Sequence, residues 1–226
     1  YLMGIFARAN YKLMDRYLLN ASVRRDGHSA FSKDNRWSTF YAFGAGWILT
    51  EEDFMKDMEW LNMLKLRGSY GITGNTAVSN SMTYLSWGLE NDKIFGVDYL
   101  HGATTVGPMG SKDLKWETTA NLDWGFDFGI LNNRINGSFA YYTQKISDLI
   151  LLGNVQPSVG FDKNQIYENV GDLKNWGFEF NVSSVNIENK NFTWKTDFNI
   201  STNKNKILKL NAAEQGKGKE EATSIR

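Results

Sequence analysis

Residues 118–130 alternate strictly between two kinds of side chain. The even positions read Thr118, Ala120, Leu122, Trp124, Phe126, Phe128 and Ile130. The odd positions read Thr119, Asn121, Asp123, Gly125, Asp127 and Gly129. Because successive side chains of a β-strand point to opposite faces, a period of two indicates a strand with one apolar and one polar face.

The alternation stops at Asn132-Asn133 and resumes with the opposite parity. A two-residue turn that pairs Leu131 with Arg134 satisfies both strands, because it places apolar residues opposite apolar ones and polar residues mostly opposite polar ones. Asn tolerates the positive φ that a type I′ turn requires. We therefore predict a β-hairpin. Its expected pairs are Ile130 with Ile135, Phe126 with Phe139, Trp124 with Tyr141, Asp127 with Ser138, and Asn121 with Gln144.

The length of this strand favours a membrane protein. Strands of globular proteins have about 5–6 residues, whereas a tilted strand that crosses a membrane needs about 9–11. The apolar face also presents Trp and Phe rather than the Val and Ile of a sandwich core. These properties are typical of a large transmembrane barrel. The alternative is a long strand of a soluble sandwich or lectin-like domain.

Other alternating segments predict more strands and a regular order of connections. The expected strands cover residues 4–12, 17–24, 37–49, 63–73, 176–183 and 192–200. Thr50-Glu51-Glu52-Asp53 predicts the start of a short helix, with the Thr50 hydroxyl capping the Asp53 amide. Short links then alternate with long ones, the latter at about 25–35, 74–113 and 147–167. Outer-membrane barrels have this arrangement, with tight periplasmic turns and long extracellular loops.

The expected fold is therefore an all-β, antiparallel transmembrane β-barrel, present here as an arc of about eight strands. A small barrel fills its interior with side chains, whereas charged inward faces suit wider barrels of roughly 16–22 strands. Tryptophans near predicted strand ends, Trp37, Trp60, Trp116 and Trp194, fit interfacial girdles. The inward face is expected to bear Arg8, Lys12, Arg24, Lys65, Arg67, Asp123, Asp127, Glu179, Lys195 and Asp197.

Composition excludes several classes of function. The 226 residues contain 25 basic and 25 acidic side chains, and this neutral balance argues against nucleic-acid binding. Without an apolar run of about 20 residues, helical membrane spans are not expected. The absence of Cys excludes thiolate zinc sites, disulfides and Cys nucleophiles. No signal peptide is visible, and we expect the chain to be a fragment that does not fold alone, because an open arc leaves two unpaired edges.

Several longer motifs follow one another along the chain. They are residues 6–11 (FARANY), 17–27 (YLLNASVRRDG), 35–37 (NRW), 64–75 (LKLRGSYGITGN), 114–119 (LKWETT), 169–172 (NVGD), 175–180 (NWGFEF) and 203–207 (NKNKI). In content and order these motifs resemble the SusC/RagA family of TonB-dependent outer-membrane transporters of Bacteroidetes. The resemblance covers essentially the whole chain.

The resemblance implies a barrel of about 22 strands with an N-terminal plug, located in the bacterial outer membrane. It implies TonB-driven import under a SusD-like surface lipoprotein, usually of a glycan oligomer and sometimes of a peptide. Residues 1–226 would then be part of the barrel domain, with the plug and the TonB box outside this chain. A lidless siderophore-type receptor and a secreted, soluble all-β glycan-binding or adhesin module remain the alternatives.

Candidate ligand-binding residues are Trp87, Tyr99 and His101, which can stack on a sugar ring or pack their own loop. His28 and His101 lack carboxylates at ligand spacing, so no metal or cofactor is expected. Asp123 and Asp127 are about 13 Å apart on one strand face, too far for a retaining carboxylate pair, and solvation or pairing with Lys and Arg is expected instead. No catalytic residue is expected.

Overall fold

The computed structural model describes residues 1–75, 111–154 and 165–209, together with the main chain of four short strands between residues 87 and 106. The long strands are β1 (Leu2–Leu13), β2 (Tyr17–His28), β3 (Trp37–Ile48), β4 (Leu61–Asn75), β9 (Glu117–Ile130), β10 (Ile135–Asn154), β11 (Gln165–Asn189) and β12 (Phe192–Lys209). The short strands are β5 (Trp87–Leu89), β6 (Asp92–Ile94), β7 (Val97–Tyr99) and β8 (Thr104–Val106).

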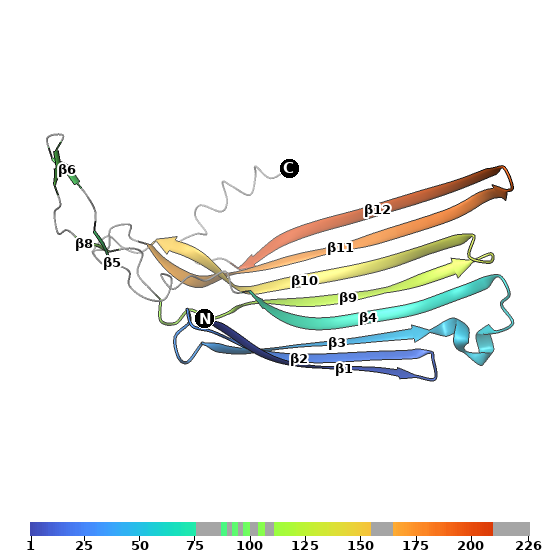
Figure 1. The fold of residues 1–226 in the computed structure, drawn as a ribbon, viewed down its shortest axis with the longest axis horizontal. Helices are drawn as coiled ribbons and strands as arrows, with labels where there is room; N and C mark the ends of the chain where they lie inside the picture. The colour runs from blue at the N-terminus through green and yellow to red at the C-terminus, as the bar shows by residue number, and fades with distance from the viewer. Residues whose placement is uncertain are drawn as a thin grey trace.

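The eight long strands form one antiparallel sheet in the order β1-β2-β3-β4-β9-β10-β11-β12 (Figure 1). Each long strand pairs with the next long strand along the chain, and β1 and β12 form the two edges of the open sheet. The short strands form two separate pairs, β5 with β8 and β6 with β7. The prediction of an all-β arc of about eight antiparallel strands is therefore confirmed.

The hairpin of β9 and β10 has the predicted register. Ile130 pairs with Ile135, and all of the other predicted pairs are present. Asn132 and Asn133 have φ values of 57° and 59°, and the Arg134 N–H donates to the Leu131 carbonyl over 3.2 Å. A type I′ turn needs positive φ at both central positions, and Asn adopts it at lower cost than most residues.

The connections divide between the two ends of the sheet (Figure 1). We call one end the turn end, because tight links of two to four residues join β1–β2, β9–β10 and β11–β12 there. The β3–β4 connection at the same end, residues 49–60, is longer than residues 29–36 and 155–164 at the other end, so the predicted alternation of short and long connections fails at this position. We call the other the loop end, where residues 29–36, 76–116 and 155–164 join the remaining strands.

The predicted helix after Thr50 is wrong. Two short 3-10 helices stand there, η1 (Leu49–Glu51) and η2 (Asp53–Met55), and neither has a side-chain cap. Glu52 lies between them with extended φ and ψ of −80° and 144°. Its carboxylate contacts residues of β2 and β3, and the extended backbone that accompanies these contacts interrupts the helix.

The predicted connection at 147–167 is too long. Strand β10 continues to Asn154 and β11 begins at Gln165, with register shifts between Ile146 and Ile150. Asp148 has a positive φ of 58° at this irregularity. A bulge moves side chains out of a period of two, so the alternation in the sequence stops although the strands continue.

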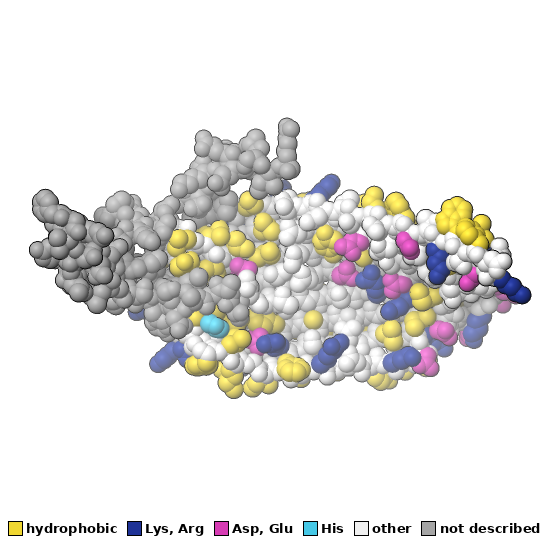
Figure 2. All heavy atoms as spheres, turned by 45° about the horizontal axis from the view of Figure 1, so that its top comes forward, with side chains coloured by type: hydrophobic (Ala, Val, Ile, Leu, Met, Phe, Trp, Pro, Cys, Tyr) yellow, Lys and Arg dark blue, Asp and Glu magenta, His cyan; other side chains and the backbone are white. Residues whose placement is uncertain are grey.

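The register places side chains of one kind on each face of the sheet. One row across the sheet reads Asn20, Gly44, Ser69, Asp123, Tyr142, Gly177 and Asn203. The row beside it reads Leu19, Ala45, Gly68, Trp124, Tyr141, Phe178 and Thr202. We call these faces the polar face and the apolar face. Figure 2 shows acidic and basic side chains interspersed with one another on the side of the sheet turned toward the viewer. All ten charged residues predicted to face inward share the polar face.

Large side chains on the apolar face are exposed, including Phe43, Trp124 and Phe198 at 55%, 50% and 54%. A soluble protein rarely leaves a continuous apolar surface of this kind uncovered. The buried core in the described residues is a small group at the loop end, consisting of Ala30, Phe31, Phe40, Leu114 and Trp116. No helix in the described part of the chain is long and apolar enough to cross a membrane.

Candidate functional site

The middle of the polar face contains an ion-pair network. Arg67 Nη1 lies 2.9 Å from Asp123 Oδ1, and Arg67 Nε lies 3.4 Å from Asp127 Oδ1. Arg67 pairs in register with Gly125, which has no side chain and leaves the guanidinium room between the two carboxylates. All three side chains are about one-third exposed, at 33%, 35% and 27%. The structure thus confirms salt bridging as the role of Asp123 and Asp127.

At the loop end the sheet opens between β3 and β4. Their pairing ends at Ala42 and Gly71, although both strands continue beyond these residues. The core group of the previous section, which we call the rim cluster, packs there. The ring of Phe40 meets that of Trp116 edge to face at 5.6 Å. A Cβ at Gly74 would collide with the Phe40 ring, so this glycine permits the close approach.

The position of Trp116 corrects one prediction. The residue is only 5% exposed and packs in the rim cluster, so it does not belong to an outward-facing girdle. Its indole Nε1 donates to the Arg36 carbonyl over 3.2 Å, which satisfies the polar atom of a buried ring. Trp37, Trp60 and Trp194 remain exposed at 40%, 56% and 53%.

A second opening lies between β9 and β10, whose pairing ends at Thr118 and Ser147. Side chains bridge it. The Asn169 Oδ1 accepts a hydrogen bond from the Lys115 N–H at 2.8 Å, and Asn169 Nδ2 donates to the carbonyls of Lys115 at 3.0 Å and Asp148 at 2.7 Å. Nearby, Glu117 accepts hydrogen bonds from Asn75 Nδ2 at 3.0 Å and from the Ile150 N–H at 3.4 Å.

Motifs that are far apart in the sequence therefore converge at the loop end. Arg36, Trp116 and Asn169 belong to three different motifs, and each contacts this end of the sheet. The 17–27 motif adds the Arg24–Asp26 ion pair at 2.6 Å, in which the Asp26 side chain is only 11% exposed. The contacts of Asn169 were not predicted, because nothing in the sequence indicates which backbone an isolated Asn side chain will contact.

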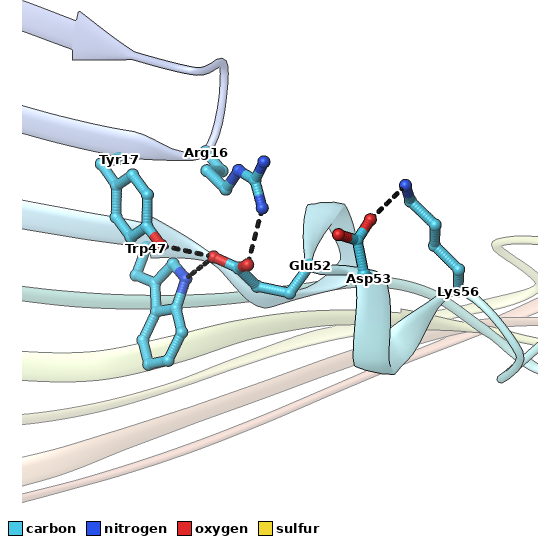
Figure 3. A network of polar contacts seen from close by, with 6 residues as sticks. All are labelled: Arg16, Tyr17, Trp47, Glu52, Asp53 and Lys56. Carbon is cyan, nitrogen blue, oxygen red and sulfur yellow. Dashed lines mark hydrogen bonds and ion pairs between the residues drawn. The ribbon is translucent and has the colours of Figure 1, made fainter.

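A separate polar network lies at the turn end (Figure 3). Glu52 accepts hydrogen bonds from Tyr17 Oη at 2.6 Å and Trp47 Nε1 at 2.9 Å, and it pairs with Arg16 Nη1 at 2.6 Å. These hydrogen bonds, from Tyr17 and Trp47 first and then Arg16, hold the pKa of Glu52 below its ordinary value. The network ties the β1–β2 turn to the β3–β4 connection.

The three predicted ligand-binding residues lie outside the part of the structure that describes side chains. Trp87 belongs to β5 and Tyr99 to β7, for which the main chain alone is described, and His101 lies outside the described residues. Their role stays a prediction. The other histidine, His28, accepts a hydrogen bond at Nδ1 from the Ala30 N–H over 3.1 Å. Among the described residues, no group of three or more His, Asp or Glu side chains is placed to hold a metal ion.

Comparison with protein families gives a match over almost the whole chain. Residues 2–219 match the family described as "TonB dependent receptor-like, beta-barrel". The chain is 41% identical over 214 residues to TonB-dependent receptor SusC of Bacteroides thetaiotaomicron, covering 92% of this chain and 21% of that protein. It is 38% identical over 209 residues to TonB-dependent receptor P3 of Formosa agariphila, covering 92% and 20%. The chain thus spans about a fifth of the length of these relatives.

Solved structures share the fold. The structure of the RagAB peptide transporter matches with a TM-score of 0.81 and 27% identity, over 94% of this chain and 23% of the matched chain. The siderophore receptor PirA of Pseudomonas aeruginosa matches with a TM-score of 0.57 and 16% identity, over 91% and 35%. At that identity, the likeness to PirA concerns the fold alone.

Proposed function

Because the chain belongs to the TonB-dependent receptor-like β-barrel family of the bacterial outer membrane, we propose that it is part of the barrel of a nutrient importer. Residues 1–226 would belong to the barrel domain, and the eight long strands would form an arc of its wall, with the apolar face toward lipid and the polar face toward the lumen. The turn end lies in the periplasm and the loop end lies outside the cell, as the tight links of β1–β2, β9–β10 and β11–β12 and the long connection of residues 76–116 indicate.

The observation that best supports this proposal is the separation of the two faces in a sheet without a covering layer. The exposed aromatic face suits hydrocarbon, which contacts the lipid-facing side chains of such barrels. The opposite face bears interspersed acidic and basic groups, such as the Arg67 network. A mixed and nearly neutral wall suits the passage of a polar oligomer without strong selection for ionic charge.

We propose a glycan oligomer as the cargo. Identity to SusC, at 41%, exceeds identity to the matched chain of the RagAB peptide transporter, at 27%. This difference supports a SusC-type assignment, for which the family resemblance implies glycan import under a SusD-like lipoprotein lid with energy from the TonB complex. Trp87, Tyr99 and His101 are the proposed residues for stacking on sugar rings.

The test is purification of the intact parent protein from native outer membranes in mild detergent, with its partners identified by mass spectrometry. We expect a surface lipoprotein in a stoichiometric amount. Growth and uptake assays with defined oligosaccharides and peptides then identify the cargo, and deletion of the parent gene should abolish uptake of the oligosaccharide. A barrel that is purified alone would contradict the lid, and uptake of peptides alone would contradict the glycan assignment.

A further inference from the structure

We propose that Asn169 is a positioning residue that holds the roots of two connections, residues 76–116 and 155–164, in one arrangement. By roots we mean the main chain at Lys115 for the first connection, and at Asp148 and Asn169 for the second. The inference rests on the proposed function, because these connections would meet the cargo outside the cell. Lys115 lies near the end of the first connection, and Asp148 and Asn169 lie on the two strands that lead to and from the second.

The side-chain amide of Asn169 hydrogen-bonds to main-chain groups as the peptide group of a neighbouring strand would. A primary amide has two N–H donors and one carbonyl acceptor, and each participates here. The acceptor and one donor pair with the N–H and the carbonyl of Lys115, at 2.8 and 3.0 Å, and the second donor reaches the Asp148 carbonyl at 2.7 Å. The amide therefore joins two segments of main chain that no regular ladder connects.

The bridge lies where main-chain pairing has ended. The ladder of β9 and β10 stops at Thr118 and Ser147, and the pairing of β10 with β11 shifts register between Ile146 and Ile150. Lys115 precedes β9 and so has no partner on β10 in the ladder. Asn169 spans this gap from β11, and the Asp148 N–H in turn donates to Asp172 Oδ1 over 3.3 Å.

Packing supports the same arrangement. Ile150 of β10 and Tyr167 of β11 pack against the rim cluster, which includes Leu114 and Trp116 on either side of Lys115. The apolar contacts bring the segments together, and the directional hydrogen bonds of Asn169 fix their register. Loss of the amide should therefore change the position of the two roots relative to each other. The β9–β10 ladder, which runs from Thr118 and Ser147 to Ile130 and Ile135, should keep its main-chain hydrogen bonds.

The test uses the full-length parent protein in outer membranes. Asn169→Ala removes all three hydrogen bonds. Asn169→Asp keeps the acceptor for the Lys115 N–H but turns a carboxylate toward two carbonyl oxygens, so we expect a larger effect. Asn175→Ala is the matched control, because Asn175 lies on the same strand and donates to Gln144 in the wall, away from both roots.

We expect Asn169→Ala to leave the barrel folded, with an unchanged gel shift between unheated and boiled samples. Amide exchange at Lys115 should become about tenfold faster, as expected for the loss of about 1.4 kcal/mol of hydrogen bonding. The KM for uptake should rise several-fold while the maximal rate stays within twofold. Asn175→Ala should change neither quantity. If Asn169→Ala leaves both the exchange at Lys115 and the KM unchanged, the positioning role is wrong.

Two other outcomes are also informative. If Asn169→Ala fails to fold while Asn175→Ala folds, the residue supports the wall itself and the positioning role is overturned. If the wild-type protein imports no oligomer, the proposed function fails. Faster amide exchange at Lys115 in Asn169→Ala would still show that the Asn169 side chain holds this segment.

Discussion

The ring of Phe31 stacks on the indole of Trp116, with ring centroids 5.1 Å apart and an interplanar angle of 23°. Phe31 lies in the connection between β2 and β3, and Trp116 lies just before β9, so the stack joins two connections across the opening between β3 and β4. Phe31 is fully buried. In a wall that otherwise exposes its large side chains, this contact gives the loop end a small core of its own.

Phe31→Ala should therefore disrupt the loop end. Removal of a fully buried Phe costs about 3–5 kcal/mol through lost burial and the cavity left behind. We expect faster amide exchange in residues 28–36 and 111–116, with the β9–β10 ladder still protected. The control is Phe54→Ala, since Phe54 is 64% exposed at the turn end and should change stability by less than about 0.5 kcal/mol. Equal effects of the two substitutions would contradict this account of the rim cluster.

The β9–β10 turn should select for residues that tolerate a left-handed backbone. Asn133 has a φ of 59°, so Asn133→Gly should be tolerated, whereas Asn133→Val should destabilise the hairpin by about 1–2 kcal/mol. Unfolding of the parent protein in urea, measured in lipid vesicles, compares the two variants. If Asn133→Val is as stable as Asn133→Gly, the turn does not have this conformation.

The Glu52 network should depend on pH. Its hydrogen bonds lower the pKa of Glu52 in the folded protein below the ordinary value of 4.5. The stabilisation is therefore complete above about pH 4.5 and is lost as the pH falls through the lower, folded-state pKa. At pH 7 we expect the main-chain amides of residues 49–55 to exchange faster with solvent in the Glu52→Gln variant than in the wild type. Dividing the exchange rate of the variant by that of the wild type at each pH cancels the intrinsic pH dependence of amide exchange. This ratio should fall toward one in acid, where Glu52 is protonated. A ratio that is constant down to pH 3 would contradict the role of the carboxylate.

The sequence was sufficient to predict the wall because each strand there follows one physical rule. Opposite faces meet lipid and water, so residues 118–130 alternate, and the Asn132-Asn133 turn sets the register of the next strand. The prediction extended to individual pairs such as Phe126 with Phe139.

The loop end could not be predicted in the same way. The bulge around Asp148 breaks the alternation, so β10 and β11 continue where the pattern ends. Trp116 lies next to a strand end. Large aromatic residues occur there both in lipid-facing girdles and in small buried clusters, so the sequence alone does not distinguish the two positions. The helix at Thr50 was mispredicted because local capping signals do not include Tyr17 and Trp47, whose contacts with Glu52 accompany an extended backbone there.

The most direct test of the central claim is to measure which face of β9 meets lipid. Single Cys residues at 121, 122, 123 and 124 of the parent protein, placed in vesicles, can be spin-labelled and probed with oxygen and with a water-soluble nickel complex. We predict high oxygen accessibility at 122 and 124, where Leu122 and Trp124 occupy the apolar face, and low oxygen accessibility at 121 and 123. Equal oxygen accessibility at all four positions, or preferential access of the nickel complex to 122 and 124, would contradict the assignment of this sheet to a membrane barrel.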